Sequence, residues 1–190
     1  MFPSVPQLIR DLWFLFLLVW FVGAFFTKHA VRKQTAVTRL REVGLGVLAG
    51  FVAVSPLLDV APFNSKFLLD TPAGAVAGLL LTFVGIAFTI WARFSLGSNW
   101  SGHVTLKQDH ALVTSGPYAL VRHPIYSGIL LAILGTAVAY RELRGLLALA
   151  IIFIAFVLKS RLEETFMLQH FGAQYSDYAQ RVKALIPFVY

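Results

Sequence analysis

Five long stretches without a charged residue restrict most strongly what this chain can fold into. They cover residues 12–27, 43–58, 71–92, 124–140 and 145–158, in a chain that is 58% hydrophobic with a mean hydropathy of +0.74. A helix needs about 17 to 25 apolar residues to cross a membrane, and fewer when charged residues at its ends snorkel to the interface. We therefore predict an all-α polytopic membrane protein with five transmembrane helices in a single domain, residues 1–190.

The segments between these stretches predict how the helices connect. Only residues 141–144, RELR, separate the last two stretches, so the fourth and fifth helices are expected to form a tight antiparallel hairpin. The polar tail is expected to extend the fifth helix to near Gly172 and then to form a short amphipathic helix from about Ser176. Small-xxx-small patterns at residues 46–50 and 74–78 indicate that the second and third helices pack closely together.

Lysine and arginine are distributed unevenly between the two sides of such a bundle. Twelve of the 16 lie in the first loop, the third loop and the C-terminal tail, and four lie on the other side. By the positive-inside rule, the N-terminus is outside and the third loop and the tail are cytosolic. Anionic lipid headgroups then account for the net charge of +7, and no nucleic-acid partner is predicted.

The residue types exclude several kinds of site. The chain has no cysteine, which rules out disulfides, thiolate metal ligands and a cysteine nucleophile. Its histidines have neither zinc-finger nor HExxH spacing, so we predict no metal site. Rossmann, P-loop and GxSxG motifs are also missing from the sequence.

The sequence Arg122-His123-Pro124 stands directly before the fourth apolar stretch. Proline is tolerated in the first turn of a helix, so we expect Pro124 to begin the fourth helix. The N-terminal end of a helix has free N–H groups and suits an anionic ligand group. Arg122 and His123 are therefore either membrane-interface anchors or parts of a site at this end of the helix.

Two adjacent carboxylates, Glu163 and Glu164, lie at the cytosolic end of the fifth helix. The tight hairpin brings them to the same membrane depth as His123. They form either surface ion pairs, such as Lys159 with Glu163 at i, i+4, or part of a cofactor site capped by the polar loop 94–124 and the tail. Neighbouring residues on a helix point about 100° apart, so only one carboxylate is expected to face the fourth helix, and we choose Glu163.

Three segments of the second half carry a combination of motifs. They are LGSNWS (96–101), HALVTSGPYALVRHPIYSG (110–128), and EETFMLQHFGAQYSDYAQRV with a later IPF (163–188). Together they resemble the isoprenylcysteine carboxyl methyltransferase family and its phospholipid methyltransferase relatives. The resemblance covers residues 94–190 and implies an integral membrane methyltransferase that uses S-adenosylmethionine at the cytosolic interface. The acceptor it implies is the carboxylate of a prenylated cysteine or of a similar lipophilic molecule.

The same resemblance implies roles for individual residues. The residues implied to bind the cofactor are His110, Leu112, Val113, His123, Pro124, Tyr126, Gly128 and Glu163. Within this set, Gly128 would allow close approach. Glu164 is implied to act in catalysis by its place in the motif, while Arg93 and Arg122 are candidates to orient a substrate carboxylate because of their charge and depth.

The residues leave the chemistry of the acceptor open. A carboxylate is ionised at neutral pH and needs no general base, whereas an amine acceptor needs a group such as Glu or His to take its proton. A phospholipid N-methyltransferase is therefore an alternative. A membrane NADPH-dependent reductase is another, since RHP also occurs in membrane sterol reductases, and a non-enzymatic membrane protein is a third. A lipid-borne acceptor predicts two openings, one toward lipid and one toward the cytosol.

Overall fold

The computed structural model describes residues 3–25, 30–33, 35–97, 105–107, 112–187 and 189. Within them, five long helices each overlap one of the predicted apolar stretches, and a short sixth helix follows. They are α1 (Val5–Ala24), α2 (Ala36–Val54), α3 (Pro72–Leu96), α4 (Pro124–Tyr140), α5 (Leu143–Phe171) and α6 (Ala173–Arg181). Short 3-10 helices lie at η1 (Pro56–Leu58) and η3 (Gly116–Ala119).

The helices form a bundle of membrane type. By length and composition, α1, α3 and α5 can each cross a membrane, and α4 is an apolar helix of 17 residues. The shorter apolar segment of α2 follows Arg39, Arg41 and Glu42 in its first half. The predicted helical membrane architecture is confirmed, while the count of five crossings stays a prediction. The all-α prediction omits one feature, an antiparallel pair of short strands, β1 (Ala30–Lys33) and β2 (Thr105–Lys107).

Local sequence signals explain where the helices begin and end. The hydroxyl of Thr71 accepts a hydrogen bond from the Gly74 N–H at 3.1 Å, and Pro72 occupies the first turn of α3. At the end of α5, Gly172 adopts φ 53°, a backbone conformation that glycine reaches without strain. The predicted end of the helix near Gly172 is confirmed, and α6 begins at Ala173, earlier than the predicted Ser176.

The closest helix pair among the described elements is the antiparallel pair α3 and α4. Glycines repeat every seven residues on both helices, and a Cβ added at Gly78 would lie 2.7 Å from the Gly135 carbonyl oxygen. One added at Gly85 would lie 2.6 Å from the Gly128 carbonyl oxygen. The two backbones therefore touch along the pair, which maximises van der Waals contact where the hydrophobic effect is weak.

The predicted glycine pairing of α2 with α3 is wrong. Among the described residues, no atom beyond the local helix backbone lies within 4 Å of a Cβ added at Gly46 or Gly50, and at Gly74 only the capping hydroxyl of Thr71 does. Gly78 does pack closely, but against α4, because α4 carries small residues at matching spacing. The partner of α2 is α5 instead.

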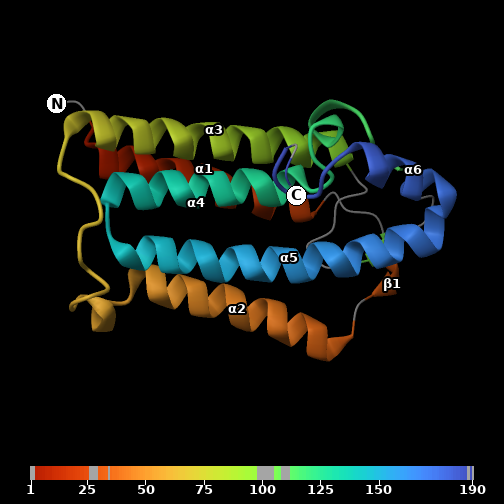
Figure 1. The fold of residues 1–190 in the computed structure, drawn as a ribbon, viewed down its shortest axis with the longest axis horizontal. Helices are drawn as coiled ribbons and strands as arrows, with labels where there is room; N and C mark the ends of the chain where they lie inside the picture. The colour runs from red at the N-terminus through yellow and green to blue at the C-terminus, as the bar shows by residue number, and fades with distance from the viewer. Residues whose placement is uncertain are drawn as a thin grey trace.

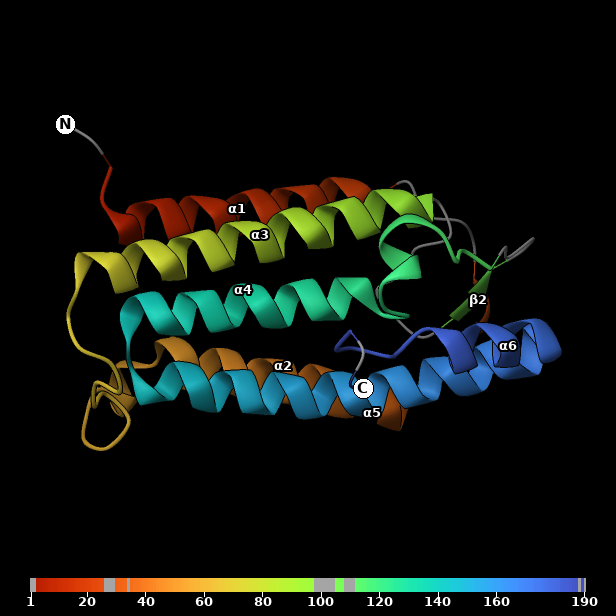
Figure 2. The same ribbon diagram turned by 45° about the horizontal axis from the view of Figure 1, so that its top comes forward.

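The helices are arranged so that α5 lies between α4 and α2, while α1 packs on α3 and α4 (Figures 1 and 2). The tight α4–α5 hairpin is confirmed: α4 ends at Tyr140 and is followed by its C-cap Arg141, which adopts φ 64°, and α5 begins at Leu143. The chain between α2 and α3 holds this turn, since the Phe67 N–H donates to the Arg141 carbonyl at 2.9 Å and Lys66 pairs with Glu142 at 2.7 Å.

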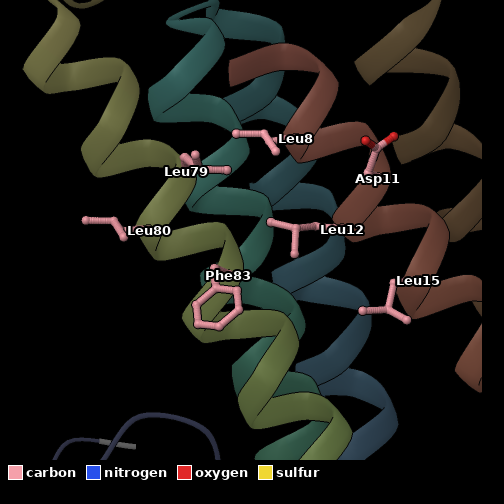
Figure 3. A pocket seen from close by; sticks show the side chains of 7 residues that line it. All are labelled: Leu8, Asp11, Leu12, Leu15, Leu79, Leu80 and Phe83. Carbon is pink, nitrogen blue, oxygen red and sulfur yellow. The ribbon is translucent and has the colours of Figure 1, made fainter. Parts of the chain in front are cut away.

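An apolar groove lies on the outer surface between α1 and α3 (Figure 3). Its lining residues are Leu8, Asp11, Leu12, Leu15, Leu79, Leu80 and Phe83. These residues come from the first halves of both helices. The groove therefore lies toward the end of the bundle opposite to His123 and is separate from the polar cluster described next.

Candidate functional site

The start of α4 and the C-terminal half of α5 bring an imidazole and two carboxylates together. The Nδ1 atom of His123 lies 3.3 Å from Oε2 of Glu163, and its Nε2 atom lies 3.0 Å from Oε1 of Glu164. The His123 side chain is 10% exposed. The predicted meeting of His123 with Glu163 is confirmed.

The expectation that only one glutamate faces α4 is wrong. Glu163 and Glu164 leave α5 in different directions. The two ring nitrogens of His123 lie on different edges of the ring, so each can face one of the two carboxylates. A single imidazole therefore contacts both neighbours. The side chains of Glu163 and Glu164 are 20% and 25% exposed, so both lie at the edge of the buried cluster.

Arg122 ties the C-terminal tail to this cluster. Its Nη2 lies 2.7 Å from Oε1 of Glu164, and its Nη1 donates to the carbonyls of Ala179 and Val182. The backbone N–H groups of Arg122 and His123 donate to the carbonyls of Lys183 and Ala184 at 2.8 and 2.9 Å. The tail consequently caps the cluster, with α6 beside it (Figure 2).

Tyr126 lies one turn further along α4 and adds an aromatic face. Its hydroxyl donates to Oε1 of Glu163 at 2.6 Å. Its ring stacks on that of His123, with centroids 5.5 Å apart, and on that of Phe156, with centroids 4.5 Å apart. The site thus combines two carboxylates, an imidazole and stacked aromatic rings at one end of the bundle.

The charge of His123 depends on this surrounding. Burial disfavours the charged imidazole, but hydrogen bonds and charge attraction from Glu163 and Glu164 outweigh burial and raise the pKa of His123 above its ordinary value. An imidazolium held between two carboxylates stabilises the contact of α4 with α5.

We predict that the stability of the folded protein falls as the pH rises through the raised pKa of His123. A raised folded-state pKa gives a stabilisation that is complete below the ordinary value of about 6.5 and is lost at higher pH. Thermal unfolding of the detergent-solubilised protein across neutral and alkaline pH measures this. The control, His123→Asn, should show a flatter profile. Parallel profiles for wild type and variant would contradict the assignment to His123.

The remaining predicted site residues fall outside the cluster or on its edge. Pro124 is buried in the first turn of α4, and Val113 packs against the buried residues Ala92, Tyr118 and Ile125. Leu112 is partly buried, and His110 lies outside the described residues.

Two of the predicted residues make contacts with other helices. The side of Gly128 where a Cβ would stand is filled by Thr89 and Gly85 of α3, so the close approach it allows is between helices. The guanidinium of Arg93 donates to the carbonyls of Gly97 at 2.9 Å and Gly23 at 2.7 Å. These contacts turn Arg93 toward the C-terminal end of α1.

Sequence reasoning missed the residues that fasten the cap. The Tyr178 hydroxyl donates to the Tyr118 carbonyl at 2.6 Å, and the Ser127 hydroxyl donates to the Leu185 carbonyl. Tyr175 and Tyr178 are the buried residues of α6. Their i, i+3 spacing on an amphipathic helix was a signal for this buried face. Ser127 offered no comparable pattern.

The comparisons with known proteins identify similar proteins over most of the chain. Residues 73–174, more than half of the chain, match the family described as phospholipid methyltransferase. A probable protein-S-isoprenylcysteine O-methyltransferase of Oryza sativa subsp. indica is 32% identical over 85% of this chain and 85% of its own length. Protein-S-isoprenylcysteine O-methyltransferase B of Arabidopsis thaliana is 34% identical over 59% of this chain, and the human enzyme is 34% identical over 60%.

The match covers a different share of each of these relatives. The match spans 58% of the Arabidopsis protein and 42% of the human one. A solved structure of a eukaryotic intramembrane Ras methyltransferase, isoprenylcysteine carboxyl methyltransferase, superimposes with a TM-score of 0.57 at 27% identity, covering 84% of this chain and 55% of that one. The family match, the rice relative and the shared fold lead to one conclusion: this chain belongs to the phospholipid methyltransferase family, together with the isoprenylcysteine O-methyltransferases to which it is similar.

Proposed function

We propose that this chain is a membrane-embedded, S-adenosylmethionine-dependent methyltransferase that methylates the carboxylate of an isoprenylcysteine or of a similar lipophilic acceptor. The observation that carries the proposal is the contact of His123 with both Glu163 and Glu164 at one end of an apolar helical bundle. The names of the rice, Arabidopsis and human relatives support the choice of acceptor.

The residues of the cluster fit the proposed cofactor. S-adenosylmethionine would supply a methyl group on a positively charged sulfonium, and it also carries a cationic amino group. Partly exposed carboxylates are suited to hold such cationic groups, and the stacked rings of Tyr126 and Phe156 offer a flat apolar face. We propose Glu163, His123 and Tyr126 as the main cofactor-binding residues, supported by Pro124, Leu112, Val113 and, by the family resemblance, His110.

The acceptor carboxylate would need positioning more than activation. It is already ionised at neutral pH, so holding it in line with the methyl group supplies most of the acceleration. The guanidinium of Arg122 is engaged by Glu164 and by the carbonyls of the tail. We therefore assign Arg122 and Glu164 a positioning role at the wall of the site. For Arg93 we propose a role in holding α1 to α3.

Transfer of a labelled methyl group tests this proposal. The purified chain in lipid vesicles is incubated with methyl-labelled S-adenosylmethionine and an S-farnesylated, N-acetylated cysteine. We expect a labelled methyl ester that releases methanol on treatment with alkali. Base-stable label on phosphatidylethanolamine would instead establish the N-methyltransferase alternative. Binding of NADPH without binding of S-adenosylhomocysteine would overturn the methyltransferase proposal.

We also propose that the cluster faces the cytosol, with the N-terminus on the other side. The support is the unequal distribution of lysine and arginine. Single cysteines at the exposed positions Ser4 and Gln180 should react with an impermeant thiol reagent from opposite sides of sealed vesicles. The cysteine-free wild type is the blank. Labelling of both variants from one side would contradict five crossings.

A further inference from the structure

A pair of opposite charges joins α2 to the site from the side opposite to the tail. The Nζ atom of Lys159 on α5 lies 3.8 Å from Oε2 of Glu42 on α2. The two side chains are only 15% and 12% exposed. Sequence spacing indicates an i, i+4 pair of Lys159 with Glu163. In the structure the charge of Lys159 attracts Glu163, and its Nζ atom also reaches a carboxylate on another helix.

Burying the charges of Glu42 and Lys159 costs desolvation free energy, which indicates a role other than stability. Desolvation of two ions often cancels their attraction, so an ion pair in an apolar bundle contributes little net stability compared with apolar residues. Both residues stand at the edge of an apolar stretch, 43–58 and 145–158, where a charged side chain can usually reach the interface, yet both are turned inward. Most of α2 outside this contact is exposed and apolar, for example Val47 at 67% and Val54 at 78% exposure. The pair thus lies where the apolar segment of α2 begins, and it is turned into the bundle.

Lys159 also lies over the aromatic ring of the site. Its Nζ atom is 5.6 Å from the centroid of the Tyr126 ring, within the range of a cation–π contact. The same ring stacks on His123, and its hydroxyl donates to Glu163 at 2.6 Å. Glu42, Lys159, Tyr126 and Glu163 therefore form one continuous series of contacts that starts on α2 and ends at His123.

We infer that Glu42 and Lys159 are positioning residues of the methyl-transfer site: Lys159 orients Tyr126 and thereby Glu163, and Glu42 orients Lys159. The inference rests on the proposed function. It brings α2 into the site, although Glu42 lies outside residues 73–174 that match the family. Lys159 acts on Glu163 through the ring and hydroxyl of Tyr126 and also by its charge.

Steady-state methyl transfer by the full chain in lipid vesicles tests the inference. Lys159→Gln should raise the KM for S-adenosylmethionine about tenfold, as expected for loss of a charge-assisted contact, with a smaller change in kcat. Lys159→Arg keeps the cation and should restore most of the loss. Arg161→Gln is the matched control, because it removes a positive charge from an exposed position on the same helix and should leave KM unchanged.

The role of Glu42 is tested by combining variants. If Glu42 acts only through Lys159, the double variant Glu42→Gln/Lys159→Gln should match Lys159→Gln alone, and Glu42→Gln should raise KM by a smaller factor. Melting temperature and gel-filtration profile of each variant separate a positioning effect from loss of fold.

Three results would overturn the inference. An unchanged KM in a folded Lys159→Gln variant would show that Tyr126 does not need the charge of Lys159 to be oriented. Failure of Lys159→Arg to restore KM would show that the effect is one of packing. If the two substitutions multiply their effects on KM in the double variant, Glu42 does not act through Lys159. A wild type that binds the cofactor but transfers no methyl group would instead overturn the proposed function, and this inference with it.

Discussion

Replacement of Glu163 by glutamine is expected to weaken the binding of S-adenosylhomocysteine by about 10- to 100-fold, since loss of a charge-assisted hydrogen bond costs about 1.5 to 3 kcal/mol. Glu163 is the carboxylate that contacts both His123 and the Tyr126 hydroxyl, the two residues that we propose to line the cofactor site. Glutamine keeps the size of the side chain and removes its charge. Isothermal titration of the purified variant measures the affinity directly.

Replacement of Glu164 by glutamine provides the comparison, with a different expected outcome. Glu164 neutralises Arg122, whose side chain is 12% exposed and holds the tail. Its loss should cost about 2 kcal/mol of folding free energy, less than the 3 to 5 kcal/mol of a fully buried pair because Glu164 is partly exposed. Affinity should change less than for Glu163→Gln. Equal affinity losses without loss of stability, or wild-type affinity of Glu163→Gln, would contradict these roles.

Substitution of Gly85 by alanine is expected to destabilise the folded protein. Its Cβ would lie 2.5 Å from the backbone nitrogen of Ala132 and 2.6 Å from the carbonyl oxygen of Gly128. Backbone atoms of a helix cannot move aside as a side chain can, so α3 and α4 must separate. Overpacking costs about 1 to 3 kcal/mol, which lowers the unfolding midpoint of a chain of this size by about 2 to 12 °C.

The control for this variant is Gly50→Ala on α2, where, in the part of the chain that the structure describes, no atom beyond the local helix backbone lies within 4 Å of the added Cβ. Alanine has a higher helix propensity than glycine by about 1 kcal/mol, so this variant should be as stable as the wild type or more stable. Both are read from thermal unfolding in the same detergent. A Gly85→Ala variant that unfolds at the wild-type temperature would show that the α3–α4 backbone contact is looser than the structure describes.

The sequence alone predicted the helical membrane architecture and the place of the candidate site along the chain. Charge-free stretches predicted where the long helices lie, because a membrane helix must bury an apolar surface of known length. The short RELR connection predicted the α4–α5 hairpin, and that hairpin predicted the meeting of His123 with Glu163. These conclusions depend only on local composition and on distances along the chain.

Only the tertiary structure decided which surfaces meet. A glycine pattern shows that a helix can be approached closely but not by which helix, so the contact of α3 with α4 could not be read from either helix alone. Likewise, the two edges of the His123 ring let both Glu163 and Glu164 contact it, although the two carboxylates diverge along α5. The partner of Lys159 is Glu42, far away in sequence, because α2 packs on α5. Contacts of this kind depend on the relative placement of whole helices, which the local sequence of each helix does not encode.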